Sequence, residues 1–166
     1  TTHKTLRGPR GGIILWNNDD YTRRINSAIF PGTQGGPLMN MIASKAQAFK
    51  EANTQEFREY TKYVIENAKA MCEVFMNNGF NVLTGGTDSH LLLLDLRDKK
   101  LSGRESADLL EKNGITVNKN GVPNDPRSFV ETSGIRIGTA AETTRGYRKA
   151  WFQQLAERIV NILNKG

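Results

Sequence analysis

The sequence predicts a mixed protein of helices and short strands in two parts, with a boundary near Asn53. Three observations lead to this expectation. A long apolar stripe at helical spacing follows the boundary, and four short apolar runs then alternate with helical segments, as in a compact α+β domain over residues 54–166. Residues 1–53 offer one or two strands and two helices, too few to complete a sheet of their own.

The first elements of the chain are short. The apolar run at residues 13–16 predicts a buried strand. Asp19 or Asp20 is expected to cap a helix that ends near Ser27, because a carboxylate at that position accepts a hydrogen bond from a free backbone N–H.

A glycine-rich loop is expected over residues 31–36, since three glycines and a proline favour neither helix nor strand. Pro37 suits the first turn of a helix, and apolar residues at positions 38, 42, 46 and 49 extend that helix to about Ala52.

The longest predicted helix is capped by Thr54 and runs to about Asn78. Gly79 suits the position just after its end. Apolar side chains three or four residues apart form its buried stripe: Phe57, Tyr60, Val64, Ala68, Met71 and Phe75.

Strands are predicted at residues 82–83 and 91–96. Ser102 and Glu105 form a capping-box pattern that starts a helix ending near Asn113, before Gly114.

The last third of the chain predicts a strand at residues 115–117 and a loop at 118–127, where Asn, Gly, Pro and Asp dominate. Residues 135–137 alternate apolar and charged, as in a strand with one functional face. A single helix is expected from about Glu142, with one apolar face that comprises Trp151, Leu155, Ile159, Ile162 and Leu163.

Composition excludes several classes of protein. Lys and Arg exceed Asp and Glu by 23 − 17 = 6, but the basic residues are interspersed with acids, so a nucleic-acid-binding module ranks last. Cys72 is the only cysteine, lies in a helical pattern, and is expected to be a packed thiol. The sequence contains no apolar run near the ~20 residues that a membrane helix needs, and two histidines argue against a zinc site.

The most informative stretch is residues 1–12, where Lys4 follows small hydroxyl residues and precedes a glycine-rich turn. A lysine at the junction of a strand and a loop can hold an aldehyde cofactor as an imine. Such a lysine must be desolvated or placed near positive charge to be nucleophilic, and His3, Arg7 and Arg10 are candidates for that charge.

Four stretches in order resemble the serine hydroxymethyltransferase family: residues 1–12, 30–37, 116–126 and 132–139. They read Thr-Thr-His-Lys-Thr with Gly-Pro-Arg-Gly-Gly, Phe-Pro-Gly-Thr-Gln-Gly-Gly-Pro, Thr-Val-Asn-Lys-Asn with Pro-Asn-Asp-Pro, and Thr-Ser-Gly-Ile-Arg-Ile-Gly-Thr. The resemblance implies that residues 1–53 are part of the large α/β domain of a fold-type I transferase, an enzyme that depends on pyridoxal 5'-phosphate. Residues 54–166 would be its small C-terminal α+β domain.

The resemblance also implies roles for residues of the first unit. Lys4 would carry pyridoxal phosphate as a covalent imine, with His3 beside it and Thr1 handling protons. Arg10 would orient the surroundings of the cofactor. Gly35 and Gly36 would contact the phosphate, which helix N-termini and open backbone favour.

In the last third of the chain, the resemblance makes Arg136 the fork that binds the substrate carboxylate. Ser128 would contact tetrahydrofolate, the co-substrate, although residues 128–131 read Ser-Phe-Val-Glu where most members read Ser-Pro-Phe-Val. Asn118 and Asn124 are further folate candidates, and turn formation explains them as well.

Family members begin a couple of hundred residues earlier, so we expect this chain to be the C-terminal part of a parent enzyme. The expected parent is a cytoplasmic homodimer, or dimer of dimers, that interconverts serine and glycine without binding nucleic acid or membrane. The alternatives are a catalytically silent folding or assembly fragment, and a related fold-type I enzyme such as a threonine aldolase.

Overall fold

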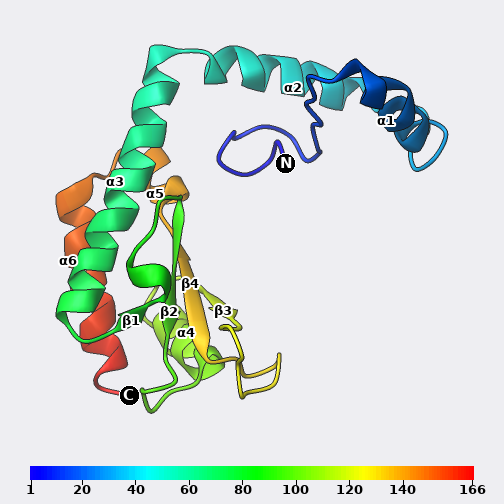
Figure 1. Ribbon diagram of the computed structural model, residues 1–166. Helices are drawn as coiled ribbons and strands as arrows, with labels where there is room; N and C mark the ends of the chain where they lie inside the picture. Colours follow the sequence, from blue (N-terminus) through cyan, green and yellow to red (C-terminus); the bar gives the residue numbers. More distant parts are fainter. The chain divides into compact units, whose positions relative to one another are not determined.

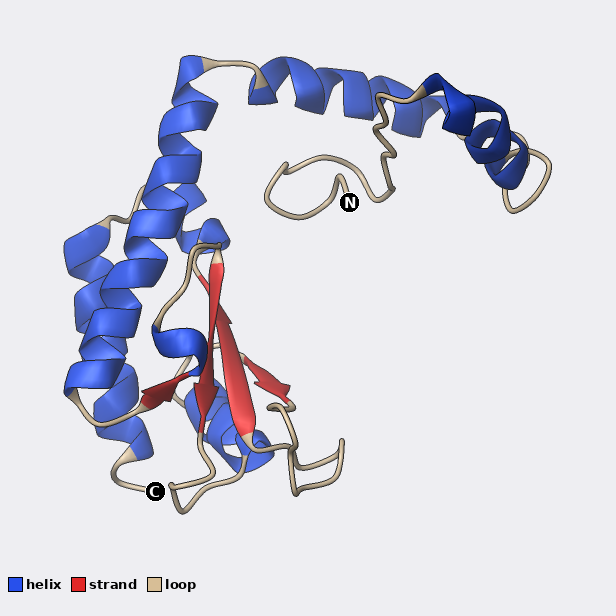
Figure 2. Cartoon of the chain, viewed as in Figure 1, coloured by secondary structure: helices blue, strands red, loops and turns tan.

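A computed structural model describes all 166 residues and divides them into two compact units, Thr1–Arg58 and Glu59–Gly166. Figures 1 and 2 show the course of the chain. The predicted mixture of helices and strands is confirmed, and the strands form one four-stranded antiparallel sheet.

The first unit contains helices and loops but no strand. A short 3₁₀ turn, η1 (Asp19–Tyr21), leads into α1 (Thr22–Ile29). The cap of η1 is Asn18, whose Oδ1 accepts a hydrogen bond from the Asp20 N–H at 2.9 Å. The prediction of Asp19 or Asp20 as the helix cap is therefore wrong.

The predicted strand at residues 13–16 is also wrong. All four side chains are exposed, from 40% at Trp16 to 82% at Leu15. A strand forms only where another strand satisfies its backbone groups, and the first unit offers no partner.

Two helices meet near the boundary between the units. The first is α2 (Met39–Ala52). The sequence predicts its first turn at Pro37, and the helix begins two residues later. The second, α3 (Gln55–Asn77), is capped as predicted, because Thr54 Oγ1 accepts a hydrogen bond from the Phe57 N–H. Gly79 follows its end with φ +73°, a left-handed conformation that favours glycine.

The sheet of the second unit has the order β1-β2-β4-β3, with every neighbouring pair antiparallel. Its strands are β1 (Asn81–Val82), β2 (Leu91–Asp95), β3 (Asn118–Asn120) and β4 (Gly134–Gly138), and the turn η2 (Leu83–Gly85) follows β1. The strands predicted around positions 82, 91–96 and 135–137 are confirmed.

The structure corrects the remaining strand. Residues 115–117 form no ladder, although Ile115 and Val117 pack on the core, and β3 lies in the segment predicted to be a loop. Residues 115–117 are apolar because they are buried, not because they pair with another strand. The strand β3 is defined instead by its backbone pairing with β4.

Helices cover one side of this sheet. The predicted capping box of α4 (Gly103–Lys112) is present in both directions between Ser102 and Glu105. The single C-terminal helix expected from Glu142 is instead two, α5 (Ala140–Thr144) and α6 (Lys149–Leu163), separated at Gly146, which has φ +99°. Glycine tolerates this conformation, which ends the first of the two helices.

The core lies between the sheet and the helices, with α3 and α6 on the same side of the sheet (Figures 1 and 2). Period-two alternation sends Leu92 and Leu94 of β2, and Ile135 and Ile137 of β4, into the core. They meet side chains of the helices, which are Met71, Cys72, Phe75, Leu110, Phe152, Ala156, Ile159 and Val160. The intervening Arg136 lies on the opposite, exposed face.

Replacement of Phe75 by alanine should destabilise the protein by about 3–5 kcal/mol, because this ring is fully buried in the core and its removal leaves a cavity. Phe129→Ala is the matched control, since that ring is 96% exposed and its loss should change stability by less than about 0.5 kcal/mol. Urea unfolding followed by circular dichroism measures both values. Equal effects of the two substitutions would contradict the assigned core.

The thiol of Cys72 should be slow to react in the folded protein. Burial raises its pKa to about 11 from an ordinary 9.0, so two pH units separate the folded and unfolded thiols and the thiolate is about a hundredfold scarcer at pH 8. Ellman's reagent at pH 8 should therefore modify Cys72 at least about a hundredfold faster in urea than in buffer. Comparable rates in the two conditions would show that the thiol is accessible.

Candidate functional site

Residues 1–12 fold into a closed loop rather than an extended arm. The loop is tied by Thr2, which is fully buried. Its N–H donates to the Gly11 carbonyl at 3.1 Å, its Oγ1 donates to the Pro9 carbonyl at 2.7 Å, and its own carbonyl accepts from the Gly8 N–H at 2.8 Å. Both ends of the loop are therefore fixed to one buried residue.

Helix α2 supports this loop at two glycines. A Cβ on Gly8 would lie 3.2 Å from that of Ala48 and 2.8 Å from the Thr2 carbonyl oxygen. A Cβ on Gly11 would lie 2.7 Å from the Lys45 ammonium, which donates to the neighbouring Gly12 carbonyl at 3.1 Å. Gly8 thus permits a close approach of loop to helix that a larger residue would prevent, whereas at Gly11 the flexible end of Lys45 could move aside.

Lys4 lies on this tied loop with its side chain exposed, and its ammonium makes no hydrogen bond or ion pair in the structure. Its carbonyl accepts a hydrogen bond from the Arg7 N–H at 2.9 Å, which forms a turn. Thr1 and Arg10 are also exposed. The sequence expected a junction of strand and loop here, and the structure has a loop alone.

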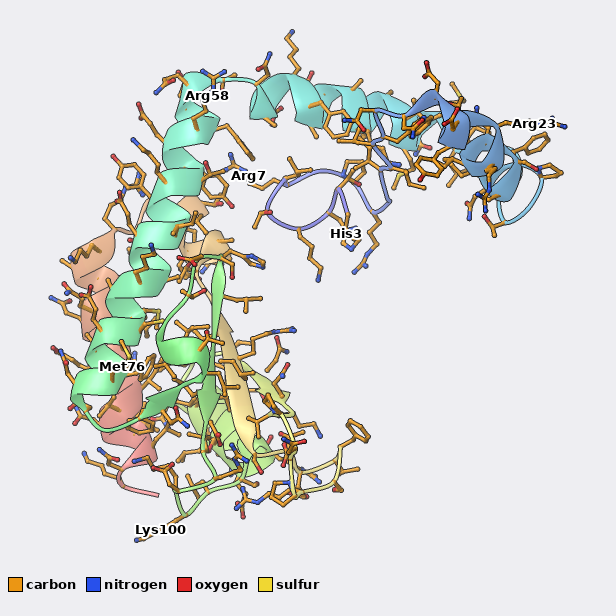
Figure 3. The ribbon with its side chains drawn as sticks, in the orientation of Figure 1. His3, Arg7, Arg23, Arg58, Met76 and Lys100 are labelled. Carbon is orange, nitrogen blue, oxygen red and sulfur yellow. The ribbon has the colours of Figure 1, made fainter.

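Two side chains of the tied loop, labelled in Figure 3, have defined contacts. His3 is half-buried, and its Nδ1 accepts a hydrogen bond from the Gly11 N–H at 3.4 Å, which leaves Nε2 as the protonated nitrogen of the neutral ring. The Arg7 guanidinium lies over the Phe57 ring, 5.2 Å from its centroid. This arginine is therefore engaged with the N-terminal turn of α3.

The glycine-rich loop has the open backbone that an anion requires. A Cβ on Gly35 or Gly36 would meet no atom within 4 Å. The loop ends at Leu38, the N-cap of α2, which provides no side-chain hydrogen bond to the first turn. The N-terminal N–H groups of α2 therefore have no side-chain acceptor, and the positive end of a helix favours a phosphate.

In the second unit, Arg136 stands at the middle of β4 on the exposed face of the sheet. It lies opposite Leu93 of β2 and Asn118 of β3. The guanidinium Nη2 donates to Asn118 Oδ1 at 3.4 Å and forms no ion pair. The remaining donors of the fork are available for a carboxylate.

Ser128 lies in the connection between β3 and β4, and its side chain is exposed. Its carbonyl accepts hydrogen bonds from the N–H groups of Glu131 and Thr132, which closes a turn around the exposed Phe129. Asn124 has φ +54°, so the alternative of turn formation holds for this residue, whereas Asn118 belongs to a strand.

Sequence reasoning missed Asp125, the residue with most hydrogen bonds in this region. Its carboxylate accepts from the N–H groups of Val122 (3.1 Å), Arg127 (3.0 Å) and Ser133 (2.8 Å), and from Ser133 Oγ at 2.6 Å. Burial raises the pKa of this carboxyl, but the four hydrogen bonds outweigh burial and hold the pKa well below its usual range. An Asp before Pro126 is a turn signal, which could have pointed to it.

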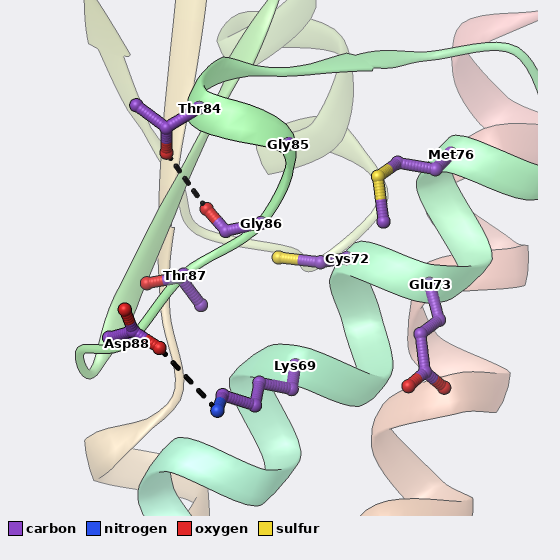
Figure 4. A pocket seen from close by; sticks show the side chains of 9 residues that line it. All are labelled: Lys69, Cys72, Glu73, Met76, Thr84, Gly85, Gly86, Thr87 and Asp88. Carbon is purple, nitrogen blue, oxygen red and sulfur yellow. Dashed lines mark hydrogen bonds and ion pairs between the residues drawn. The ribbon is translucent and has the colours of Figure 1, made fainter.

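A cavity of about 450 Å³ lies between α3 and the turn after β1 (Figure 4). Cys72 and Met76 contribute sulfur atoms to its wall, and an ion pair of 3.5 Å joins Lys69 to Asp88 at its edge. None of the residues predicted as functional lines this cavity.

The structure thus gathers the predicted residues into two groups. Thr1, His3, Lys4 and Arg10 share the tied loop of the first unit. Arg136 and Ser128 lie on β4 and its connecting loop in the second. No group of three or more His, Cys, Asp or Glu side chains could hold a metal ion, and none of the helices has the length and apolar character needed to cross a membrane.

Comparisons with known proteins agree on one family. The family model described as serine hydroxymethyltransferase matches residues 1–159. Proteins named serine hydroxymethyltransferase from Afipia carboxidovorans and a Methylobacterium species are each 54% identical to this chain over 164 residues, or 99% of it. One from a Wolbachia of Culex pipiens is 54% identical over 163 residues, or 98% of the chain.

The chain spans 38% of the length of each of these relatives. The match lies in their C-terminal part, as the four sequence motifs imply. The family model covers nearly the whole chain, and the relatives are more than half identical to it. Both lead to the same family. The chain belongs to the serine hydroxymethyltransferase family.

Proposed function

We propose that the protein to which this chain belongs interconverts serine and glycine and transfers the one-carbon unit to or from tetrahydrofolate. The observation that carries this proposal is the position of Lys4 on a loop tied at both ends to Thr2, which fixes the backbone that bears its amine. A lysine that holds a cofactor needs a fixed position.

The residues present fit pyridoxal phosphate. Lys4 offers the amine that would hold the aldehyde, and the open backbone at Gly35 and Gly36, before the uncapped start of α2, suits the phosphate. When bound, this cofactor withdraws electrons from the α-carbon of an amino acid. In the family, the glycine loop serves the site of a neighbouring subunit, so a homodimer belongs to the proposal.

Arg136 would bind and orient the amino-acid substrate. Its guanidinium fork can donate two parallel hydrogen bonds to the α-carboxylate, which fixes the orientation of the substrate. Asn118 already accepts one hydrogen bond from this fork and holds it on the exposed face of β4. Leucine side chains pack on the opposite face, so the position of the arginine backbone is set by the core.

The other residues of the loop would act around Lys4. His3 Nδ1 is held by the Gly11 N–H, so its Nε2 is the nitrogen that can donate to a ligand. Thr1 would move a proton at its hydroxyl, and Arg10 would provide positive charge near the cofactor. Ser128, on its closed turn, would contact tetrahydrofolate.

The domain assignment belongs to the same proposal. Residues 1–53 would be part of the large cofactor domain, and residues 54–166 would be the small C-terminal domain. We further propose a cytoplasmic protein, in keeping with its single buried, unpaired cysteine.

The direct test replaces the corresponding C-terminal segment of the Afipia carboxidovorans relative with this chain. The graft should bind pyridoxal phosphate on Lys4 and cleave serine in a reaction that requires tetrahydrofolate. Borohydride reduction followed by mass spectrometry identifies the modified lysine. Modification elsewhere would overturn the cofactor assignment, and cleavage that needs no folate would favour a threonine aldolase.

Lys4→Ala in this graft should remove at least 99% of serine turnover and all labelling of the loop, because no other amine of the tied loop can replace it. Lys100→Ala is the matched control, since Lys100 is an exposed lysine of the second unit with no assigned role. It should leave activity within twofold. Full activity of the Lys4 variant would refute the role of this residue.

Arg136→Lys should raise the KM for serine by about 10- to 100-fold, because an ammonium cannot form the parallel pair of hydrogen bonds and each charged hydrogen bond contributes about 1.5–3 kcal/mol. Arg23→Lys, an exposed arginine of α1, serves as the control. Steady-state kinetics at saturating folate provide the measurement. An unchanged KM in the Arg136 variant would exclude this residue as the carboxylate ligand.

A further inference from the structure

The loop that joins β3 to β4 is closed by a single carboxylate. Asp125 accepts hydrogen bonds from Val122, which comes two residues after β3 ends, and from both the N–H and the hydroxyl of Ser133, which comes just before β4 begins. The carboxylate therefore joins the end of one strand to the start of the next.

The half-buried carboxylate meets a fully buried partner at one end of the connection. Ser133 is fully buried, and the bond from its Oγ to Asp125 measures 2.6 Å. The Ser133 carbonyl accepts from the Leu96 N–H at 2.8 Å, which ties the same residue to the segment after β2. Ser133 is thus fixed by both of its backbone groups and by its side chain.

The ladder between β3 and β4 is short. β3 is an edge strand of three residues, paired only with β4. Asn120 lies opposite Gly134, and Asn118 lies opposite Arg136. A slip of one residue would send side chains to the opposite face and remove Asn118 from the guanidinium.

Close packing at Gly134 gives the register a fixed end. A Cβ at this position would lie 2.7 Å from the Leu94 carbonyl oxygen and 2.9 Å from that of Asn120. The Val122 side chain, 2.8 Å from the same position, also packs there, so Gly134 leaves no room for a side chain of its own. A further contact joins β3 to the connecting loop, where Lys119 Nζ donates to the Val130 carbonyl, but both groups are exposed.

We infer that Asp125 is a positioning residue for the substrate carboxylate, since through Ser133 and Val122 it fixes the register that holds Asn118 against Arg136. This inference rests on the proposed function, in which Arg136 binds that carboxylate. Asp125 itself lies in the connecting loop and acts through the strands.

The chemistry of the side chain explains why an aspartate is needed. Two carboxylate oxygens accept all four hydrogen bonds, and each oxygen receives two. An asparagine has the same shape but one acceptor oxygen, and its NH₂ group would face N–H donors. Asp125→Asn should therefore release half of the contacts, whereas Ser133→Ala removes only the one from the hydroxyl.

The first experiment uses the 166-residue chain and needs no catalysis. In Asp125→Asn, the N–H groups of Ser133 and Asn120 should exchange with D₂O at least tenfold faster, and the Nε–Hε resonance of Arg136 should shift. Asp108→Asn, an exposed aspartate of α4, should change neither. Unchanged exchange at Ser133 and an unchanged Arg136 resonance would overturn the inference.

The second experiment measures serine turnover in the graft described above. Asp125→Asn should raise the KM for serine about tenfold while kcat stays within threefold, and Ser133→Ala should produce a smaller rise. Asp125→Asn combined with Ser133→Ala should add little to Asp125→Asn alone, because the Ser133 hydroxyl acts through the Asp125 carboxylate. Asp125→Glu should recover part of the affinity.

The outcomes separate the two proposals. An inactive graft with wild-type sequence would reject the proposed function, while the exchange and resonance data would still decide whether Asp125 fixes the register. Should Asp125→Asn fail to fold, Ser133→Ala, which removes one hydrogen bond, provides the same readouts. If Asp125→Asn lowered kcat and left the KM for serine unchanged, the positioning role would be overturned. The same holds if the Ser133 N–H lost its protection from exchange while the KM for serine stayed unaltered.

Discussion

Burial of one face of the ladder between β2 and β4 is the constraint on which the second unit depends. Leu92, Leu94, Ile135 and Ile137 alternate with exposed positions, and all four contact the helices. Burial of a large aliphatic side chain contributes about 1.5–3 kcal/mol, so this face sets the position of every element around it. The two central strands pair over five residues each, whereas β1 and β3 are shorter and pair along the outer edges of this ladder. Arg136 takes its place on the open face because its two neighbours are in the core.

The first unit is held by a different kind of interaction. Its loop is organised by a buried threonine and by glycines that let the backbone approach α2 closely, and few of its apolar side chains are buried. Ile13, Ile14, Leu15 and Trp16 are largely exposed. Polar contacts of the backbone therefore define the surroundings of Lys4, whereas apolar packing defines those of Arg136.

Local chemistry made much of this structure predictable from the sequence. The capping box at Ser102, the cap at Thr54 and Gly79 after α3 involve residues within four positions of one another, and each is present. The motifs around Lys4 and Arg136 identified the family before any geometry was known, and the comparisons confirmed it. Alternation at residues 135–137 also predicted the exposed face that Arg136 occupies.

The errors in the strand assignment arose where distant parts of the chain decide the outcome. Residues 13–16 have strand-like composition but no partner, and residues 118–120 have loop-like composition but pair with β4. Asp125 was missed for the same reason, since its contact with Ser133 spans eight residues. Roles that follow from the resemblance and stay predictions are those of Thr1, His3, Lys4, Arg10, Gly35, Gly36, Ser128 and Arg136.

The closed connection between β3 and β4 also constrains how this region can change in evolution. Insertion or deletion of one residue between Val122 and Asp125, or between Thr132 and Arg136, would alter the spacing that the carboxylate bridges or exchange the core and solvent faces of β4. Residues 128–130 lie between the two ends of that bridge, at an exposed tip of the loop. Length changes among relatives should therefore gather at this tip, where the loop can vary its reach while the strand pair below it keeps its alignment.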